Sequence, residues 1–283
     1  MIAFDYLASP GQLGNQMFKF AALKGIADNN GYDYLMPPSL LWLEDYKLSY
    51  KVFKKLNKYK YQNHFLFDIF ELSSVSKKNI KFSNFSKAIS PEDKRFDNNL
   101  FNNCPDNVQL KGYFQSAKYF DNISDVIKKD FTFKKKYSKI GDNLFEGFKD
   151  PISIHIRRGD YVTHPNHFAV ETEYYIKGID YFGQKENFLV FTDDPIWFKN
   201  QKFFSTSNFT LMSELTNNST VLDLYIMSLC RKHIIANSTF SWWGAWLSGS
   251  KDVVFPLNWY KDKKDSSEDI PLKDWVGIDN NET

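Results

Sequence analysis

The stretch Ile152 to Tyr161, ISIHIRRGDY, is the part of the sequence that most clearly decides the fold. Its first residues alternate, so the isoleucines lie on one face of an extended strand while Ser153, His155 and Arg157 lie on the other. The strand then runs into two arginines, a glycine and an aspartate. This pattern predicts a buried strand with a charged carboxyl end.

Strands and helices alternate downstream of this stretch. Asn187 to Phe191 is a short apolar run, typical of a strand in a covered parallel sheet. It ends in TDDP, where Asp194 is expected to cap a helix and Pro195 to occupy its first turn. The later predicted elements are a helix over Ser219–Leu229, a strand over His233–Asn237, a helix opened by Ser238–Leu247 and a strand over Asp252–Phe255. The pattern predicts an open α/β sheet in the C-terminal half.

The N-terminal half is less regular. The expected elements are a strand over Met1–Leu7, a loop over Ser9–Asn15, a helix from about Gln16 to Ala27, helices without fixed ends over Leu35–Lys87, and a buried strand running into a helix over Leu110–Phe120. The composition shifts over residues 141–151. We therefore predict two domains, residues 1–148 and residues 149–283, with a weakly patterned tail from Lys261.

Composition excludes several classes of protein. The chain has 283 residues, of which 42% are hydrophobic and 25% charged, so it can bury a large core and is neither disordered nor fibrous. Its 36 basic and 34 acidic residues argue against a general nucleic-acid surface. The basic run from Lys51 to Lys60 is interpreted as the solvated face of a helix; contact with an anionic membrane or a charged acceptor is the alternative.

No apolar run reaches the roughly 18 residues that a membrane-spanning helix needs. The first residues, MIAFDYLASPGQ, lack the basic start and long apolar stretch of a signal peptide, so we expect a cytoplasmic protein. Cys104 and Cys230 have no neighbours at zinc-ligand spacing. They are expected to be two buried thiols.

Four polar groups follow predicted strands or open predicted helices: GQLGN, HIRRGDY, FTDD and NSTFS. Ligands of open parallel sheets bind beyond the carboxyl ends of the strands, so these groups predict one binding site. The glycines Gly11 and Gly14 allow a close backbone approach to a ligand, although a tight turn explains them equally well.

The paired arginines favour an anionic ligand, because a guanidinium fork matches two phosphate oxygens. We assign Arg157 to the anion. For Arg158, pairing with Asp160 and contact with a ligand are weighed equally. His155 shares the face of Arg157 and is expected to line the ligand, a satisfied core histidine being the alternative.

The stretch NSTFS places hydroxyls and backbone N–H groups at a helix start, which suits an anion. Capping by Ser238 or Thr239 is compatible with that role. Asp193 and Asp194 are expected either to bind a base or ribose or to cap a helix. The tryptophans of the next helix, Trp242, Trp243 and Trp246, are interpreted as packing residues rather than as a sugar platform.

Several common motifs are absent from the sequence. It has no GxxxxGK[ST], GxGxxG, GxSxG or HExxH, and no Asp-x-Asp, the spacing with which many sugar transferases hold a metal–diphosphate. The arginine pair can supply that positive charge instead. We therefore hypothesise a diphosphate site that needs no metal.

Together these motifs carry a resemblance. HIRRGDY, with GQLGNQMF before it and FTDD and NSTFSWWGAWL after it, resembles glycosyltransferase family 11, the α-1,2-fucosyltransferases that use GDP-fucose. LKGYFQSAKYF, residues 110–120, is similar to another segment of that family. Gln12 stands where the family often has glycine. The resemblance implies a GT-B-like fold, with two Rossmann-type halves facing across a cleft. It implies that residues 1–148 form the acceptor-side domain and residues 149–283 the GDP-sugar donor-binding domain.

The resemblance also implies roles for single residues. It places Arg157 on the diphosphate, His155 and Asp193 or Asp194 at the guanine nucleotide, and Gly14 and Asn15 near the phosphate and fucose. Ser238, Thr239, Phe240 and Ser241 would contact phosphate. The implied reaction is an inverting displacement. Asp160 is the candidate base, and Glu171 and Glu173 are the alternatives.

The predicted activity is transfer of L-fucose from GDP-β-L-fucose to the 2-hydroxyl of a terminal galactoside, with no metal cofactor, in the synthesis of a glycan or surface polysaccharide. Peripheral contact with a lipid-linked acceptor is left open. Two alternatives remain: a transferase with another GDP-sugar or a non-galactose acceptor, and a glycan- or nucleotide-binding protein without turnover.

Overall fold

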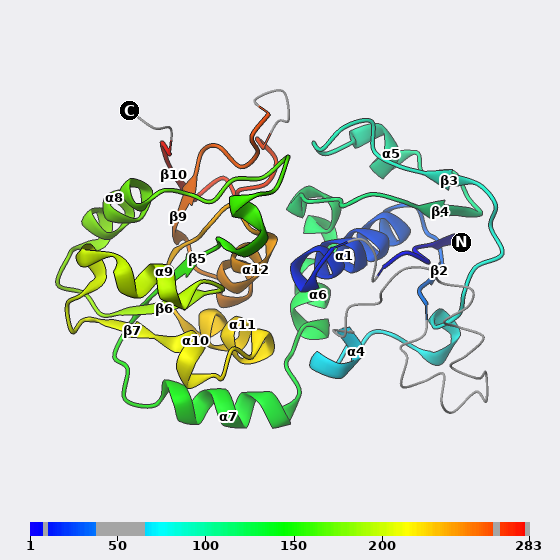
Figure 1. The fold of residues 1–283 in the computed structure, drawn as a ribbon. Coiled ribbons are helices and arrows are strands. Elements are labelled where there is room, and N and C mark those ends of the chain that lie inside the picture. Colours follow the sequence, from blue (N-terminus) through cyan, green and yellow to red (C-terminus); the bar gives the residue numbers. More distant parts are fainter. Residues whose placement is uncertain (8–10, 38–65, 263–266, 281–283) are drawn as a thin grey trace. The chain divides into compact units, whose positions relative to one another are not determined.

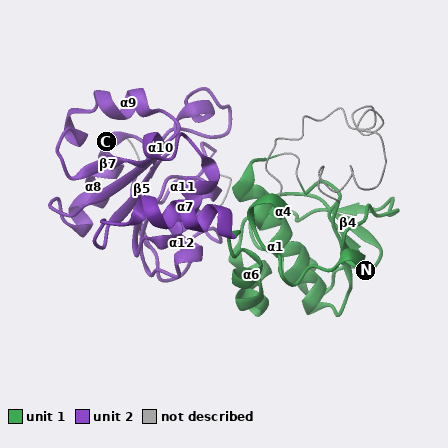
Figure 2. Ribbon diagram, turned by 90° about the horizontal axis from the view of Figure 1, so that it is seen from below, with its two compact units in different colours: residues 1–134 green, residues 135–283 purple. Residues whose placement is uncertain are grey.

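The computed structural model describes residues 1–7, 11–37, 66–262 and 267–280. The chain forms two compact units, residues 1–134 and 135–283 (Figure 2). The division lies before the predicted boundary at 148/149. The reason is helix α7 (Lys135–Phe145), which packs on the second unit: the Tyr225 hydroxyl donates to Asp142 Oδ1 at 2.6 Å, and Gly141 lies against the Tyr225 ring.

Unit 2 is built on a six-stranded parallel sheet in the order β10-β9-β8-β5-β6-β7 (Figure 1). Its strands are β5 (Ile152–Ile156), β6 (Phe188–Thr192), β7 (Phe209–Leu211), β8 (Lys232–Ile234), β9 (Asp252–Pro256) and β10 (Val276–Ile278). The chain moves outward from β5 through β6 and β7, then returns to place β8 on the other side of β5. The strand order therefore reverses between β5 and β8, where open α/β sheets bind ligands.

Helices connect these strands. They are α8 (Thr172–Phe182), α9 (Pro195–Asn200), α10 (Met212–Leu215), α11 (Thr220–Leu229) and α12 (Thr239–Ser248), with short 3-10 turns at Gly159–Val162 and Lys202–Phe204. The isoleucines of β5 pack in one core cluster, while Leu189 and Phe191 of β6 pack in another with residues of α10 and α11. Trp242 and Trp243 are fully buried, which confirms their predicted packing role.

Unit 1 has a four-stranded sheet in the order β2-β1-β4-β3. Its strands, all parallel, are β1 (Ile2–Ala3), β2 (Tyr34–Leu35), β3 (Ala88–Ile89) and β4 (Val108–Leu110). Helix α1 (Leu13–Asn29) is the long central helix, and the shorter ones are α4 (Leu66–Ile69), α5 (Asn98–Asn102) and α6 (Ser124–Asp130), with 3-10 turns at Lys77–Asn79, Ala117–Tyr119 and Asp121–Ile123. A Cβ at Gly25 would lie 1.8 Å from the Tyr119 carbonyl oxygen, so only glycine fits this close helix contact.

Unit 1 departs most from the predicted elements. The strand expected over Met1–Leu7 is limited to β1, and the helix expected after Leu110 is an irregular segment followed by one 3-10 turn. Of the helices predicted over Leu35–Lys87, the described residues contain only α4 and the turn Lys77–Asn79. The basic run Lys51–Lys60 lies outside the described residues. Side-chain anchors hold this unit together, for example the buried ion pair of Lys24 with Asp130.

Candidate functional site

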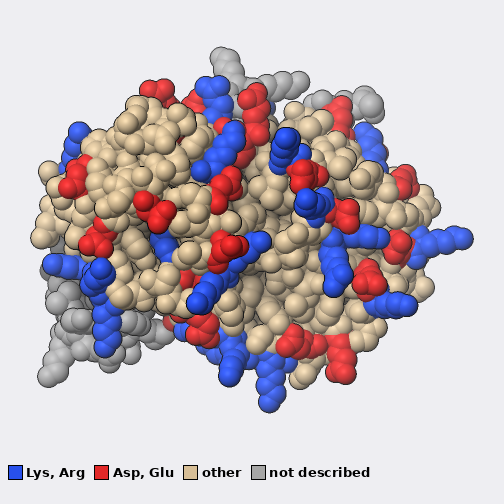
Figure 3. Space-filling model, turned by 180° about the vertical axis from the view of Figure 1, so that it is seen from behind, with Lys and Arg blue, Asp and Glu red and all other residues tan. Residues whose placement is uncertain are grey.

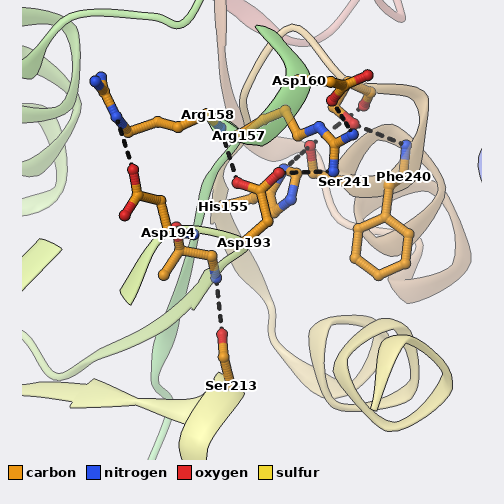
Figure 4. Close-up of polar contacts among 11 residues, drawn as sticks. His155, Arg157, Arg158, Asp160, Asp193, Asp194, Ser213, Phe240 and Ser241 are labelled. Carbon is orange, nitrogen blue, oxygen red and sulfur yellow. Dashed lines mark hydrogen bonds and ion pairs between the residues drawn. The ribbon is translucent and has the colours of Figure 1, made fainter. Parts of the chain in front are cut away.

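Three predicted motifs come together at the carboxyl ends of β5, β6 and β8. Strand β5 pairs with both neighbours: Ile154 lies opposite Val190 of β6 and Ile234 of β8. The arginine pair, the aspartate pair and the start of α12 therefore meet at one edge of the sheet (Figure 4). This edge is the candidate site of unit 2.

Arg157 is held by carboxylates on two sides. Its Nη1 lies 2.8 Å from Asp193 Oδ2, and its Nη2 donates to Asp160 Oδ1. The guanidinium carbon also lies 5.2 Å from the centroid of the Tyr161 ring. The side chain is only 18% exposed, so its direction is fixed before any ligand binds.

Arg158 points away from Arg157 (Figure 4). Its backbone N–H donates to Asp193 Oδ1 at 2.8 Å, its Nε lies 3.5 Å from Asp194 Oδ2, and its guanidinium carbon lies 4.3 Å from the Trp197 ring centroid. The carboxylate considered as its partner, Asp160, pairs instead with Arg157. Arg158 thus joins β5 to the start of α9.

The two aspartates after β6 make different contacts. Asp194 accepts from the Trp197 backbone N–H at 2.9 Å and caps α9, with Pro195 in its first turn as predicted. Asp193 binds both arginines. A Cβ at Gly159 would lie 2.5 Å from Asp193 Oδ2, so glycine leaves the room that this carboxylate occupies.

His155 is buried beside the start of α12. Its Nδ1 lies 2.9 Å from Ser241 Oγ, and its ring centroid lies 5.4 Å from that of Phe240. Burial, and secondarily the Arg157 charge, lower the pKa of His155 to about 3. The imidazole is therefore neutral at physiological pH and offers one donor and one acceptor nitrogen.

The start of α12 is polar and free of acidic residues in its first turn. Ser238 caps the helix by accepting from the Phe240 backbone N–H at 3.4 Å, and Ser241 Oγ donates to the Ser238 carbonyl at 3.3 Å. Thr239 is the first helical residue. The positive end of the helix dipole thus lies beside His155, where an anion is stabilised.

Asp223 on α11 is a buried acid that the sequence reasoning did not single out. Thr216 Oγ1 donates to its Oδ1 at 2.6 Å, and burial raises the pKa of Asp223 to about 6. The sequence feature that points to it is a single aspartate within the apolar run STVLDLYIMSL. Trp197 and Gly159 were missed too, because their roles depend on contacts between strands.

The remaining predicted donor residues, Gly14 and Asn15, lie in unit 1. Gly14 is buried in the first turn of α1, and Asn15 Oδ1 accepts from Gln115 Nε2 at 2.7 Å. Of the alternative bases, Glu171 immediately precedes α8 and Glu173 lies in its first turn.

Other features of the described residues bear on partners and metals. These residues contain no group of three His, Cys, Asp or Glu side chains placed to hold a metal ion. None of their helices is long and apolar enough to cross a membrane.

On the face shown in Figure 3, basic and acidic side chains are interspersed. Cys104 and Cys230 are buried free thiols, as predicted, and burial raises their pKa to about 11 and about 12.

Solved structures show the same fold. POFUT1 in complex with GDP superposes with a TM-score of 0.50 at 11% identity, covering 88% of this chain and 94% of that chain. The predicted fold class is confirmed: the protein is α/β and GT-B-like, with parallel sheets.

Sequence comparisons give the family. An alpha-1,2-colitosyltransferase of Escherichia coli is 30% identical over 288 residues, covering 95% of this chain and 97% of the relative. The O-antigen biosynthesis glycosyltransferase WbnK of Escherichia coli is 29% identical over 311 residues, covering 96% and 100%. A galactoside 2-alpha-L-fucosyltransferase of Caenorhabditis elegans is 28% identical over 57% of this chain and 47% of the relative. The model of glycosyl transferase family 11 matches residues 5–279, and the chain is a member of that family of glycosyltransferases.

Proposed function

We propose that this glycosyltransferase transfers L-fucose from GDP-β-L-fucose to the 2-hydroxyl of a terminal galactoside, with inversion and without a metal. One observation carries the proposal. Arg157 is fixed at the point where the strand order of unit 2 reverses, on the side of β5 that faces the start of α12. A guanidinium fork and a helix N-terminus together suit a diphosphate.

The same groups favour the departure of GDP. Negative charge builds on the leaving phosphate as the bond to fucose breaks, and donors already aimed at that charge lower the barrier. Arg157 and the first turn of α12 supply these donors. The diphosphate would replace a carboxylate on Arg157, so the guanidinium would keep its direction while exchanging one anion for another.

Neutral His155 is proposed to bind the guanine nucleotide, together with Asp193 or Asp194. Asp160 is the proposed base for the acceptor hydroxyl. Asp160 pairs with Arg157, and exchange of this carboxylate for the diphosphate would free it to face the acceptor hydroxyl. Glu171 and Glu173 are the alternatives, and a dissociative reaction needs little help from a base.

A second candidate donor is favoured by one observation. The Escherichia coli relative at 30% identity is an alpha-1,2-colitosyltransferase, and colitose is the 3-deoxy analogue of L-fucose. A transferase for GDP-colitose would keep the diphosphate site and differ only at the sugar. The intact Arg157–Asp160 pair and the polar start of α12 argue against a binding protein without turnover.

The test is transfer by the purified protein from GDP-fucose to lactose, with and without EDTA, with the linkage read by NMR. GDP-colitose, GDP-mannose and UDP-galactose serve as the other donors. Fucose on the galactose 2-hydroxyl, formed equally with EDTA, is the expected result. Turnover with GDP-colitose alone would assign the second candidate. No transfer from any of the four donors, together with no calorimetric binding of GDP, would refute the proposal.

A further inference from the structure

The segment after β4 presents one tyrosine to solvent. Tyr113 is 43% exposed and stands between two residues with positive φ, Gly112 at +134° and Phe114 at +54°. Non-glycine residues seldom adopt such a φ, and backbone strain of this kind gathers at binding sites, where the surrounding structure holds it in place. The placement of Tyr113 is therefore a specified feature of the fold.

Contacts of the two residues after Tyr113 hold the strained segment. The Phe114 ring is buried against Phe4 and Tyr119, with centroids 5.7 Å and 5.1 Å away. The next residue, Gln115, donates to Asn15 in the first turn of α1 at 2.7 Å. Core contacts and a hydrogen bond to α1 thus fix the backbone from which Tyr113 projects.

A buried lysine lies against the Tyr113 ring. Lys19 is one helical turn after Asn15, and its Nζ lies 5.4 Å from the Tyr113 centroid and 5.8 Å from that of Phe4. The ammonium also donates to the Tyr6 carbonyl oxygen at 3.4 Å. Cation–π contact favours one ring position, so Tyr113 is oriented although it is partly exposed. Burial lowers the pKa of Lys19 to about 8, which leaves it mostly charged at pH 7.

We propose that Tyr113 is the acceptor platform of this transferase and determines acceptor specificity. Its exposed ring would pack against the C–H face that carbons 3, 4 and 5 of a β-galactoside present. Asn15, which is predicted to lie near the phosphate and fucose, is linked to the same segment through Gln115. Tyr113 is therefore tied, within unit 1, to a residue that the family resemblance places near the fucose. The inference rests on the proposed function and assigns Tyr113 to binding, not to chemistry.

The test compares Tyr113→Ala and Tyr113→Phe with the parent protein. A matched control is Tyr181→Ala, because Tyr181 is 55% exposed on α8 of unit 2. The measurements are the KM for lactose, the KM for GDP-fucose and the Tm. We expect Tyr113→Ala to raise the lactose KM at least about tenfold, roughly 1.4 kcal/mol. In the same variant, the KM for GDP-fucose and the Tm should stay at their parent values. Tyr113→Phe should keep the kinetics of the parent protein, and Tyr181→Ala should change none of the three quantities.

The results separate this inference from the proposed function. An unchanged lactose KM in Tyr113→Ala, with an active parent protein, would overturn the platform and leave the function standing. A fall in Tm accompanied by a rise in both KM values would assign Tyr113 a structural role and overturn the platform as well. A parent protein that transfers no fucose to lactose would overturn the proposed galactoside acceptor and the platform together.

Discussion

Arg157 Nη1 lies 2.8 Å from Asp193 Oδ2, which joins the first residue after β5 to the first residue after β6. The contact follows from the sheet register, because Ile156 and Thr192 are paired residues at the ends of these strands. Gly159 gives the carboxylate its space. Arg157 is therefore oriented by the backbone of the sheet, as a donor preset for a developing charge requires.

On the proposed function, Arg157→Ala should lower kcat at least about a hundredfold, because it would remove a donor whose hydrogen bonds strengthen as the diphosphate leaves. The fold should survive, since Arg157 lies beyond the end of β5. The measurement is kcat with GDP-fucose and lactose, together with the Tm. Arg231→Ala, at an exposed arginine, is the matched control. Parent-like turnover in folded Arg157→Ala would contradict the assignment.

Asp160→Asn should lower kcat and tighten GDP binding. The exposed Asp160 carboxylate pairs with Arg157 and would therefore compete with the proposed diphosphate for it, whereas the uncharged amide of the variant would compete less. The measurements are kcat and the Kd of GDP by calorimetry, with Asp252→Asn as the exposed control. Full activity in Asp160→Asn would remove it as the base, and weaker GDP binding would show that it does not compete.

Ser241→Ala should raise the KM for GDP-fucose by roughly tenfold, because His155 would lose the hydroxyl that orients its ring. The chain offers a close control. Ser248 Oγ lies 2.9 Å from Nε2 of His233, a second buried histidine outside the predicted site. Ser248→Ala should lower the Tm and leave the KM unchanged. Equal kinetic effects of the two variants would argue against a donor-binding role for His155.

Asp223→Asn should change the pH dependence of stability. Burial raises the pKa of folded Asp223 to about 6, from 3.8 in its unperturbed form. The folded state therefore binds this proton more tightly than the unfolded state does. The resulting stabilisation of the folded state is complete below about pH 4 and is lost as the pH rises through 6. The Tm of the variant minus the Tm of the parent should therefore be larger at pH 8 than at pH 5. A Tm difference independent of pH would show that Asp223 is not the titrating group.

Local sequence signals predicted the parts of the site that depend on one segment. Strand β5 appears in the alternation of Ile152 to Ile156, and the start of α9 in the pairing of a capping Asp194 with Pro195. The apolar run before Asn237 and the helix start at Ser238 placed β8 and α12 in the same way. Each of these signals lies within one short segment, so it can be detected in a single sequence without knowledge of the tertiary contacts.

Contacts between segments were not predictable in this way. The pairing of Arg158 with Asp194 and Trp197, in place of Asp160, depends on the register of β5 against β6. The exposure of Tyr113 depends on a positive φ at Phe114, which no propensity predicts and which core packing of its ring maintains. Tertiary contacts decide both arrangements.

The most direct test of the central claim, a GDP site centred on Arg157, is calorimetric titration of the parent protein and Arg157→Ala with GDP, using UDP as the control nucleotide. GDP should bind the parent protein and UDP should not, and Arg157→Ala should bind GDP at least about tenfold more weakly, roughly 1.4 kcal/mol. A parent protein that binds no GDP, or an Arg157→Ala variant that binds it equally well, would contradict the claim.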